Sequence, residues 1–228
     1  MESGTRTTPT RRAGRPRLTD VRIRDACVRL FAQKGFQGTG IREIAAEAGV
    51  TTAALYHYVG TKEELLLEIM SGVLDPLTAA ARRIVTDVDR SEARLSALVE
   101  HHVWFHAVHQ LASIVTDTEI RSLSSDARAE MIARRDVYEA IWRSVVVEGV
   151  AEDTFRVEDP RIATTALLQM CTGIAHWYAP TGPLTLTRLC RMHADLALSM
   201  VRAARNGVPL RVDALELPSP AREPSVQG

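Results

Sequence analysis

The chain has 228 residues with 28 basic and 28 acidic side chains, so its formal net charge is zero. With 46% hydrophobic and 25% charged residues, its composition is typical of a globular protein, which argues against fibrous and fully disordered classes. The N-terminus lacks the apolar segment of a signal peptide, and no uninterrupted apolar run reaches the roughly 18 residues that span a bilayer. We therefore expect a cytoplasmic protein without membrane association.

Positive charge is concentrated at the N-terminal end. Residues 1–42 contain ten Lys or Arg against three Asp or Glu, and the rest of the chain is acidic by the same surplus of seven. A basic head on an acidic body predicts that a polyanion contacts one end of the protein only.

All elements expected along the chain are helices, because apolar residues recur at steps of three and four and no alternating strand pattern appears. In chain order, with Gly and Pro marking several ends, the expected helices cover 19–35, 41–48, 52–58, 61 to about 85, 91 to about 115 with a short turn to 120, 125 to about 150, 159 to about 179, and 185 to about 206. The Asp75-Pro76 pair is expected to bend or break the fourth of these.

This pattern predicts an all-α protein in two folded parts between two disordered ends. Residues 1–18 carry too few apolar groups to fold and form a disordered basic arm. Residues 19–65 are expected to form an N-terminal three-helix domain, and residues 66–207 a larger helical domain. The Pro-rich residues 208–228 are expected to be a disordered tail.

The segment 41–58 has helix-turn-helix spacing. Ala45 is small enough for two helices to cross closely, and Gly49, four residues later, permits the left-handed backbone of a tight turn. Thr51 or Thr52 can cap the second helix. In such a unit the second helix lies in the DNA major groove. Glycine turns between helices are common, so a helical hairpin with solvated polar residues is the alternative interpretation.

Side chains expected to contact DNA lie on the second helix and on both sides of it. Threonine and alanine methyl groups suit base edges, whereas Tyr, His, Lys and Arg suit phosphates. The candidates in the folded part are Thr39, Arg42, Thr51, Thr52, Ala53, Tyr56, His57 and Lys62.

The basic arm adds a second candidate contact with DNA. Arg15 and Arg17 belong to "RRAGRPR", a slim Arg-Gly-Pro segment that fits a minor groove, where A·T-rich DNA concentrates negative potential. A solvated charge run is the alternative interpretation, and the adjacent helix-turn-helix favours the groove.

The segment "ACVRLFAQKGFQGTGIREIAAEAGVTTAALYHYVGTKEELLLEIM" resembles the N-terminal domain of the TetR family of transcriptional regulators over about residues 19–70. The resemblance implies an all-helical two-fold dimer, a repressor that binds double-stranded operator DNA, and a ligand pocket in the C-terminal domain. Carried over by position in the motif, it also implies DNA contacts by Thr39, Thr52, Tyr56, His57 and Lys62. Gly40 departs from the family's Ser or Thr, and Val59 from its Phe.

The C-terminal half is similar to a TetR subgroup that senses acyl-CoA thioesters, on the segments around "WFHAVHQLASIV" and "MCTGIAHWYAPTGPLTL". This resemblance implies release from the operator by a small apolar effector such as an acyl-CoA; the alternative is an apolar drug-like molecule or another metabolite. Aromatic and flexible apolar side chains suit such a ligand, with arginine for phosphates. The candidate pocket residues are His102, Trp104, Phe105, Leu111, Val115, Arg135, Tyr138, Trp142, Met170 and Trp177.

The last two long helices are the expected dimer interface. Their apolar stripes, which include Leu167, Trp177, Leu196 and Met200, are broader than one chain requires, and pairing across a two-fold axis makes a four-helix interface. A role for both stripes in the monomer's core alone is the alternative.

We expect no cofactor, no metal and no catalysis. The sequence has no Gly-rich phosphate loop, no nucleophile elbow and no paired carboxylates with a nucleophile. One expected helix carries His101, His102, His106 and His109. The last three fall on one helical face and could present imidazoles to a metal together, but buried hydrogen-bonded histidines or pocket polar groups are the preferred interpretation. The three cysteines lack metal-ligand spacing and are expected to be reduced and buried.

Overall fold

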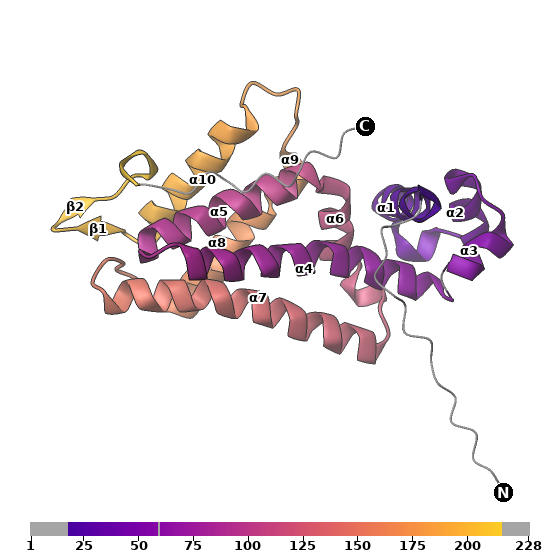
Figure 1. Ribbon diagram of the computed structural model, residues 1–228, viewed down its shortest axis with the longest axis horizontal. Helices are drawn as coiled ribbons and strands as arrows, with labels where there is room; N and C mark the ends of the chain where they lie inside the picture. Colours follow the sequence, from indigo (N-terminus) through magenta and orange to yellow (C-terminus); the bar gives the residue numbers. More distant parts are fainter. Residues whose placement is uncertain (1–17, 59, 216–228) are drawn as a thin grey trace, which may run out of the picture.

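A computed structural model describes residues 18–58 and 60–215. The described part is a small head of three short helices joined to a longer helical body, and a two-residue-strand hairpin lies at the end of the body away from the head (Figure 1). This arrangement confirms the predicted all-α fold with an N-terminal helix-turn-helix domain. No helix in the described ranges is long and apolar enough to cross a membrane.

The head consists of α1 (Leu18–Gly38), α2 (Ile41–Ala48) and α3 (Thr52–Tyr58). α1 loses regular helical geometry at Gly35, where the periodicity predicted its end. Gly49 ends α2 with φ 65° and ψ 39°, and its amide donates to the carbonyls of Ala45 and Ala46. The predicted turn is therefore present, because glycine adopts this left-handed conformation without a steric cost.

One helix joins the head to the body. α4 (Lys62–Asp87) starts with a capping box, in which Thr61 accepts from the Glu64 amide and Glu64 accepts from the Thr61 amide. Pro76 does not break this helix, as one of the two predicted outcomes required, because α4 runs uninterrupted through it. Burial of Val73, Leu74 and Leu77 on either side offsets the missing amide hydrogen bond.

The helix expected over 91–115 is instead two. α5 (Ser91–Val108) ends at His109, whose φ of −109° and ψ of 40° are not helical, and α6 (Gln110–Thr118) follows, then the 3-10 turn η1 (Glu119–Ser122). The bend lets α6 pack against α1 and α4 at once. Apolar periodicity alone did not reveal this bend, because both halves keep a helical pattern.

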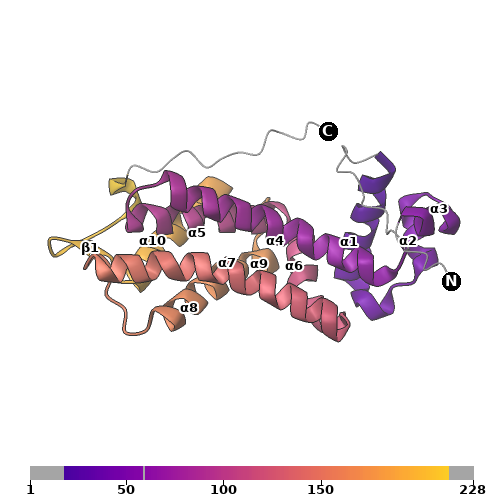
Figure 2. The ribbon, with the colours of Figure 1, turned by 60° about the horizontal axis from the view of Figure 1, so that its bottom comes forward.

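The body is completed by α7 (Ser125–Ala151), α8 (Pro160–Thr172), α9 (Ile174–Trp177) and α10 (Leu186–Met200). α4 and α7 lie side by side along the molecule (Figure 2). Asp159 caps α8 by accepting from the amides of residues 161 and 162, as its Asp-Pro start predicted. The helix expected to continue to about 179 is interrupted at Gly173, between α8 and α9.

The C-terminal region corrects the predicted ends of the last helix and of the folded part. α10 ends at Met200, and residues 204–209 form an antiparallel hairpin, β1 (Ala204–Arg205) with β2 (Val208–Pro209). The intervening Asn206-Gly207 pair, with φ of 51° and 78°, suits a two-residue hairpin turn. In η2 (Val212–Ala214), Val212 is buried and its amide donates to Asp195 Oδ1. Residues 208–215 therefore belong to the fold, and 216–228 lie outside the described residues.

The cysteines Cys27, Cys171 and Cys190 are buried free thiols, as the sequence predicted. Burial raises the pKa of Cys27 and of Cys190 to about 12 and the pKa of Cys171 further still. A thiol with so high a pKa is not a nucleophile at neutral pH, so these residues pack as small apolar groups.

Close packing at the end of α7 gives a test of the fold. A Cβ added to Gly149 would lie 2.1 Å from the Phe155 ring, whereas one added to Gly40 would meet nothing within 4 Å. Gly149→Ala should therefore lower the free energy of unfolding by about 1–3 kcal/mol, and Gly40→Ala should change it by less than about 0.5 kcal/mol. Urea denaturation compares the two variants. Equal stabilities would contradict the packing described.

Candidate functional site

α3 presents one buried and one exposed face. Leu55 is fully buried and holds the helix to the head, while Tyr56 is 54% exposed and Ala53 and His57 are also exposed. Thr51 is exposed and caps the helix, its Oγ1 accepting from the Ala54 amide at 3.1 Å. The predicted base-edge and phosphate candidates thus lie together on the free side of α3.

α2 is fixed to α1 by two exposed ion pairs. Arg29 binds Glu47 at 3.0 Å, and Lys34 pairs with Glu43. The hydrogen bond that the Lys34 ammonium donates is the main cause that lowers the pKa of the Glu43 carboxyl. Arg42, at the start of α2, has an exposed side chain, as a phosphate contact requires.

Two predicted DNA contacts are corrected by the structure. Thr39 is 2% exposed, and its hydroxyl donates to the carbonyls of Gly35 at 2.8 Å and Leu30 at 3.3 Å. Lys62 is half-buried, and its Nζ donates to the carbonyls of Phe36 at 2.7 Å and Thr39 at 2.9 Å, 4.2 Å from the Phe36 ring centroid. Lys62 thereby ties the start of α4 to the end of α1, whereas Thr39 bonds to carbonyls of α1 within the head.

Three other positions that entered the sequence argument cannot be placed. Arg15 and Arg17 of the basic arm, and Val59 after α3, lie outside the described residues.

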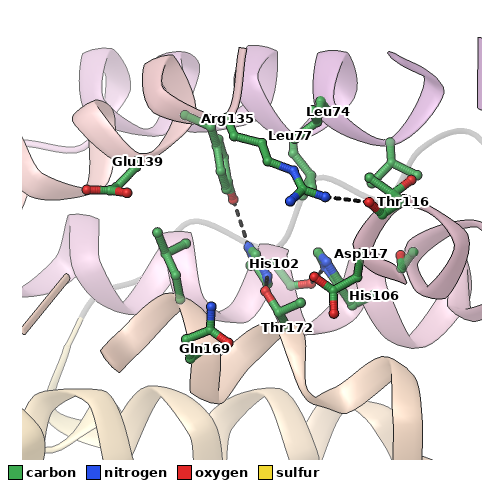
Figure 3. A pocket seen from close by; sticks show the side chains of 14 residues that line it. Leu74, Leu77, His102, His106, Thr116, Asp117, Arg135, Glu139, Gln169 and Thr172 are labelled. Carbon is green, nitrogen blue, oxygen red and sulfur yellow. Dashed lines mark hydrogen bonds between the residues drawn. The ribbon is translucent and has the colours of Figure 1, made fainter. Parts of the chain in front are cut away.

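The body contains a cavity of about 180 Å³ between α4, α5, α6, α7 and α8 (Figure 3), which opens to solvent beside the exposed residues Asp117 and Gln169. Of the predicted pocket residues, His102, Arg135 and Tyr138 line it. The full set of lining residues is Val73, Leu74, Leu77, His102, His106, Ser113, Thr116, Asp117, Arg135, Tyr138, Glu139, Leu168, Gln169 and Thr172.

The remaining predicted pocket residues do not line this cavity. Phe105, Val115 and Trp142 are buried in the core, Trp104 and Met170 are half-buried elsewhere, and Leu111 and Trp177 are exposed. Large aromatic groups fill core space most completely, so the open space is left beside smaller and polar side chains. Leu111 faces outward because the bend at His109 gives α6 its own buried face.

A hydrogen-bonded histidine pair forms one wall of the cavity. His102 Nδ1 lies 2.9 Å from the Tyr138 hydroxyl and its Nε2 lies 3.2 Å from Thr172 Oγ1. The His106 ring stacks on it at 4.0 Å between centroids, with Nδ1 3.0 Å from the His102 carbonyl. Burial lowers the pKa of His106 to about 4 and that of His102 well below its ordinary value, so both rings are neutral at pH 7.

The opposite wall carries a cation. Arg135 donates from Nη2 to the Thr116 carbonyl (Figure 3), and burial lowers its pKa. Asp117 also lines the cavity, and its Oδ2 lies 3.5 Å from His176 Nε2 on α9. Within the described ranges, no group of three His, Cys, Asp or Glu is arranged to hold a metal ion.

Sequence reasoning missed the polar residues that α6 and α8 contribute. Ser113, Thr116 and Asp117 come from α6, and Gln169 and Thr172 from α8. Gln169 and Thr172 lie off the apolar stripe of their helix, where polar residues are expected at the surface, so the sequence did not mark them as lining residues. The α6 residues gave no signal either, because their direction depends on the bend at His109.

The chain matches two family models and many known proteins. Residues 23–69 match the model described as bacterial regulatory proteins, tetR family, and residues 88–201 match the one described as tetracyclin repressor-like, C-terminal domain. The HTH-type transcriptional repressor KstR2 of Rhodococcus jostii is 29% identical over 185 residues, covering 80% of this chain and 90% of that protein. KstR2 of Mycobacterium tuberculosis is 30% identical over 178 residues, covering 74% and 86%.

A solved structure also matches over most of its length. The crystal structure of AibR in complex with isovaleryl coenzyme A and operator DNA superposes with a TM-score of 0.69 and 27% identity, covering 77% of this chain and 97% of that one.

The contacts of Lys62 can be distinguished from a phosphate contact by their salt dependence. Lys62→Met should weaken binding to duplex DNA while leaving the slope of log affinity against log salt unchanged, because its ammonium neutralises no phosphate; Thr39→Val should also weaken binding, and it removes no charge. Arg42→Met is the charged control and should reduce that slope by about 1.8 in a dimer, which loses one phosphate contact per subunit. Fluorescence anisotropy over a salt series measures all three. A slope change of that size for Lys62→Met would show that Lys62 contacts the backbone.

The buried histidines predict acid sensitivity. Burial lowers the pKa of both His101 and His106 from 6.5 to about 4, so the unfolded chain binds protons below pH 6.5 that the folded chain does not. Stability is complete above pH 6.5 and should fall by about 2 kcal/mol per histidine on going to pH 5. Thermal denaturation from pH 7 to 5 measures this. His106→Gln should weaken the dependence and His57→Gln should not; an unchanged dependence in His106→Gln contradicts the assignment.

Proposed function

Because the chain belongs to the TetR family, and is therefore a ligand-responsive DNA-binding regulator and not an enzyme, we propose that it is a cytoplasmic homodimeric repressor released from its operator by an acyl-CoA. The exposed face of α3 carries this proposal. Thr51, Ala53, Tyr56 and His57 project from a helix that Leu55 anchors, which is the arrangement that suits insertion into a major groove.

The effector proposal rests on the relatives and on the cavity. AibR was crystallised with isovaleryl coenzyme A and operator DNA. A cavity of about 180 Å³ is small beside the roughly 300–1,000 Å³ of pockets that enclose drug-sized ligands. It suits an acyl group and leaves the nucleotide part of a CoA outside. An apolar drug-like effector remains the second candidate.

A dimer through α8 and α10 is supported by the apolar groups that these helices and α9 leave uncovered. Trp177 is 58% exposed and Leu196 53%, and Ile162, Met192 and Met200 are exposed beside them. The other half of each predicted stripe, such as Leu167 and Leu189, is buried within the monomer. Each stripe therefore serves the core on one side and leaves the other side for a partner.

Two described routes connect the cavity to the head. α4 carries Val73, Leu74 and Leu77 at the cavity and Lys62 at the head. α6 carries Thr116 and Asp117 at the cavity. It packs on α1 of the head and is followed in the chain by η1 and then α7.

The ends of both routes meet near the head. Glu63 accepts from the Ser124 amide at 2.6 Å, and this hydrogen bond lowers the pKa of Glu63. η1 packs on α1, where a Cβ on Gly35 would meet Glu119 at 3.3 Å. A ligand that moves α6 or α4 would therefore tilt α3 in each subunit and break the match to two half-sites, which lie roughly 34–36 Å apart.

Selection from a random duplex library tests the DNA-binding proposal. We expect enrichment of an inverted repeat, bound with an affinity that falls steeply with salt, and release of the selected duplex by acyl-CoA thioesters but not by free CoA. An absence of sequence preference would reject the operator proposal. Release only by apolar compounds without CoA would favour the second effector class.

The dimer interface is tested by a charge on α10. Leu196→Glu should shift the protein to monomer and weaken operator binding by about a hundredfold or more, because burying an unpaired carboxylate at the interface is costly. Val147→Glu places the same charge on α7, outside the proposed interface helices, at a side chain that is 49% exposed. Sedimentation velocity and anisotropy compare them. A dimeric Leu196→Glu variant would locate the interface elsewhere.

A further inference from the structure

Ten of the fourteen residues that line the cavity carry a polar group, although the larger part of the surface exposed in the cavity is apolar. Four of the fourteen lining residues are aliphatic: Val73, Leu74, Leu77 and Leu168. The others carry hydroxyl, imidazole, amide, guanidinium or carboxylate groups. A bare alkyl chain inserted here would displace water from these groups and offer no hydrogen bond in return.

Five buried side-chain atoms of the described residues have no hydrogen-bond partner, and among them the Ser113 hydroxyl belongs to a residue that lines the cavity. It is buried and lines the cavity, and in the described part of the chain its Oγ has no hydrogen-bond partner. Other buried hydroxyls differ, because Ser96 and Thr116 donate to the carbonyls of Glu92 and Ala112, four residues earlier. A buried hydroxyl without a partner is costly, so Ser113 points to a ligand atom that completes its bonding.

His106 supplies the complementary acceptor. Its Nδ1 faces the His102 carbonyl, which can only accept, so the proton of the neutral ring is on Nδ1 and Nε2 is left as an acceptor. The carboxylates of Asp117 and Glu139 line the same cavity, while Arg135 donates to the Thr116 carbonyl. This charge arrangement favours an uncharged oxygen group over a carboxylate.

The volume limits the size of the inserted group. An apolar protein cavity of about 150 Å³ accommodates one benzene molecule, and this cavity measures about 180 Å³. It therefore has room for one six-membered ring or for a chain of about six to eight non-hydrogen atoms.

We propose that the part of the effector inserted into this cavity is a short, uncharged, oxygenated group, a hydroxy- or oxo-acyl group. Its oxygen accepts a hydrogen bond from Ser113 Oγ, and a hydroxyl oxygen can in addition donate to His106 Nε2. This inference rests on the proposed function and specifies its effector. A site that hydrogen-bonds a ligand oxygen discriminates against the ligand lacking it, because its own polar groups are then left unpaired.

Calorimetric titration of the full chain with matched thioesters tests the proposal. Hexanoyl-CoA is compared with 3-oxohexanoyl-CoA and 6-hydroxyhexanoyl-CoA, which place the oxygen near and far from the thioester. At least one oxygenated thioester should bind about tenfold more tightly than hexanoyl-CoA. Hexanoyl-CoA binding as tightly as both would overturn the proposal.

Two serine variants assign the preference. Ser113→Ala should abolish the difference between the thioesters, whereas Ser96→Ala, which removes a buried but satisfied hydroxyl outside the cavity, should retain it. Melting temperatures confirm that both variants fold. A preference that persists in Ser113→Ala would overturn the role of Ser113.

Failure of the acyl-CoA proposal is distinguishable from failure of this inference. If no thioester binds, the effector is not an acyl-CoA, and the chemistry of the cavity is then decided with free rings. Cyclohexanone and cyclohexanol should raise the melting temperature more than methylcyclohexane, and Ser113→Ala should remove that difference. Equal shifts, or no shift with any ring, would overturn the inference.

Discussion

The first turn of α4 is the connection on which the rest of the molecule depends. Lys62 donates to two carbonyls at the end of α1, and the next residue, Glu63, accepts from the amide that precedes α7. One turn of helix is thereby bonded to the DNA-binding head on one side and to the body on the other. The bonds of Lys62 and Glu63 are charge-assisted, and such hydrogen bonds are stronger than neutral ones. A movement of α4 would therefore change the position of the head.

The cavity combines two demands that usually conflict. The helices that form it also form the core of the body, where unpaired polar groups are costly, yet ten of its fourteen lining residues carry a polar group. The conflict is reduced by internal bonding: His102 is held between Tyr138 and Thr172, and Arg135 by a carbonyl of α6. Thr116 belongs to α6, which packs on α1 and is followed by η1. The bond from Arg135 to the Thr116 carbonyl therefore joins the cavity wall to a helix that contacts the head.

Sequence reasoning succeeded wherever the signal was local. The head helices, the turn at Gly49 and the cap at Asp159 were predicted because each depends on a few neighbouring residues. The prediction of the pocket residues failed where no local signal exists. Aromatic residues such as Trp142 were expected to surround a ligand, but Trp142 fills the core and Trp177 lies on the surface. A large apolar side chain suits any buried position, so its identity alone cannot distinguish a core from a cavity wall.

The sequence by itself determined the helical fold, the helix-turn-helix and its exposed helix, and family membership, because helical periodicity and turn residues act over a few positions. Only the tertiary structure decided that Thr39 and Lys62 bond to carbonyls of α1 or its end, that α5 and α6 separate at His109, and that Ser113 and His106 line one cavity. Those outcomes depend on contacts between residues far apart in the chain, where the direction of a side chain is fixed by what packs against it.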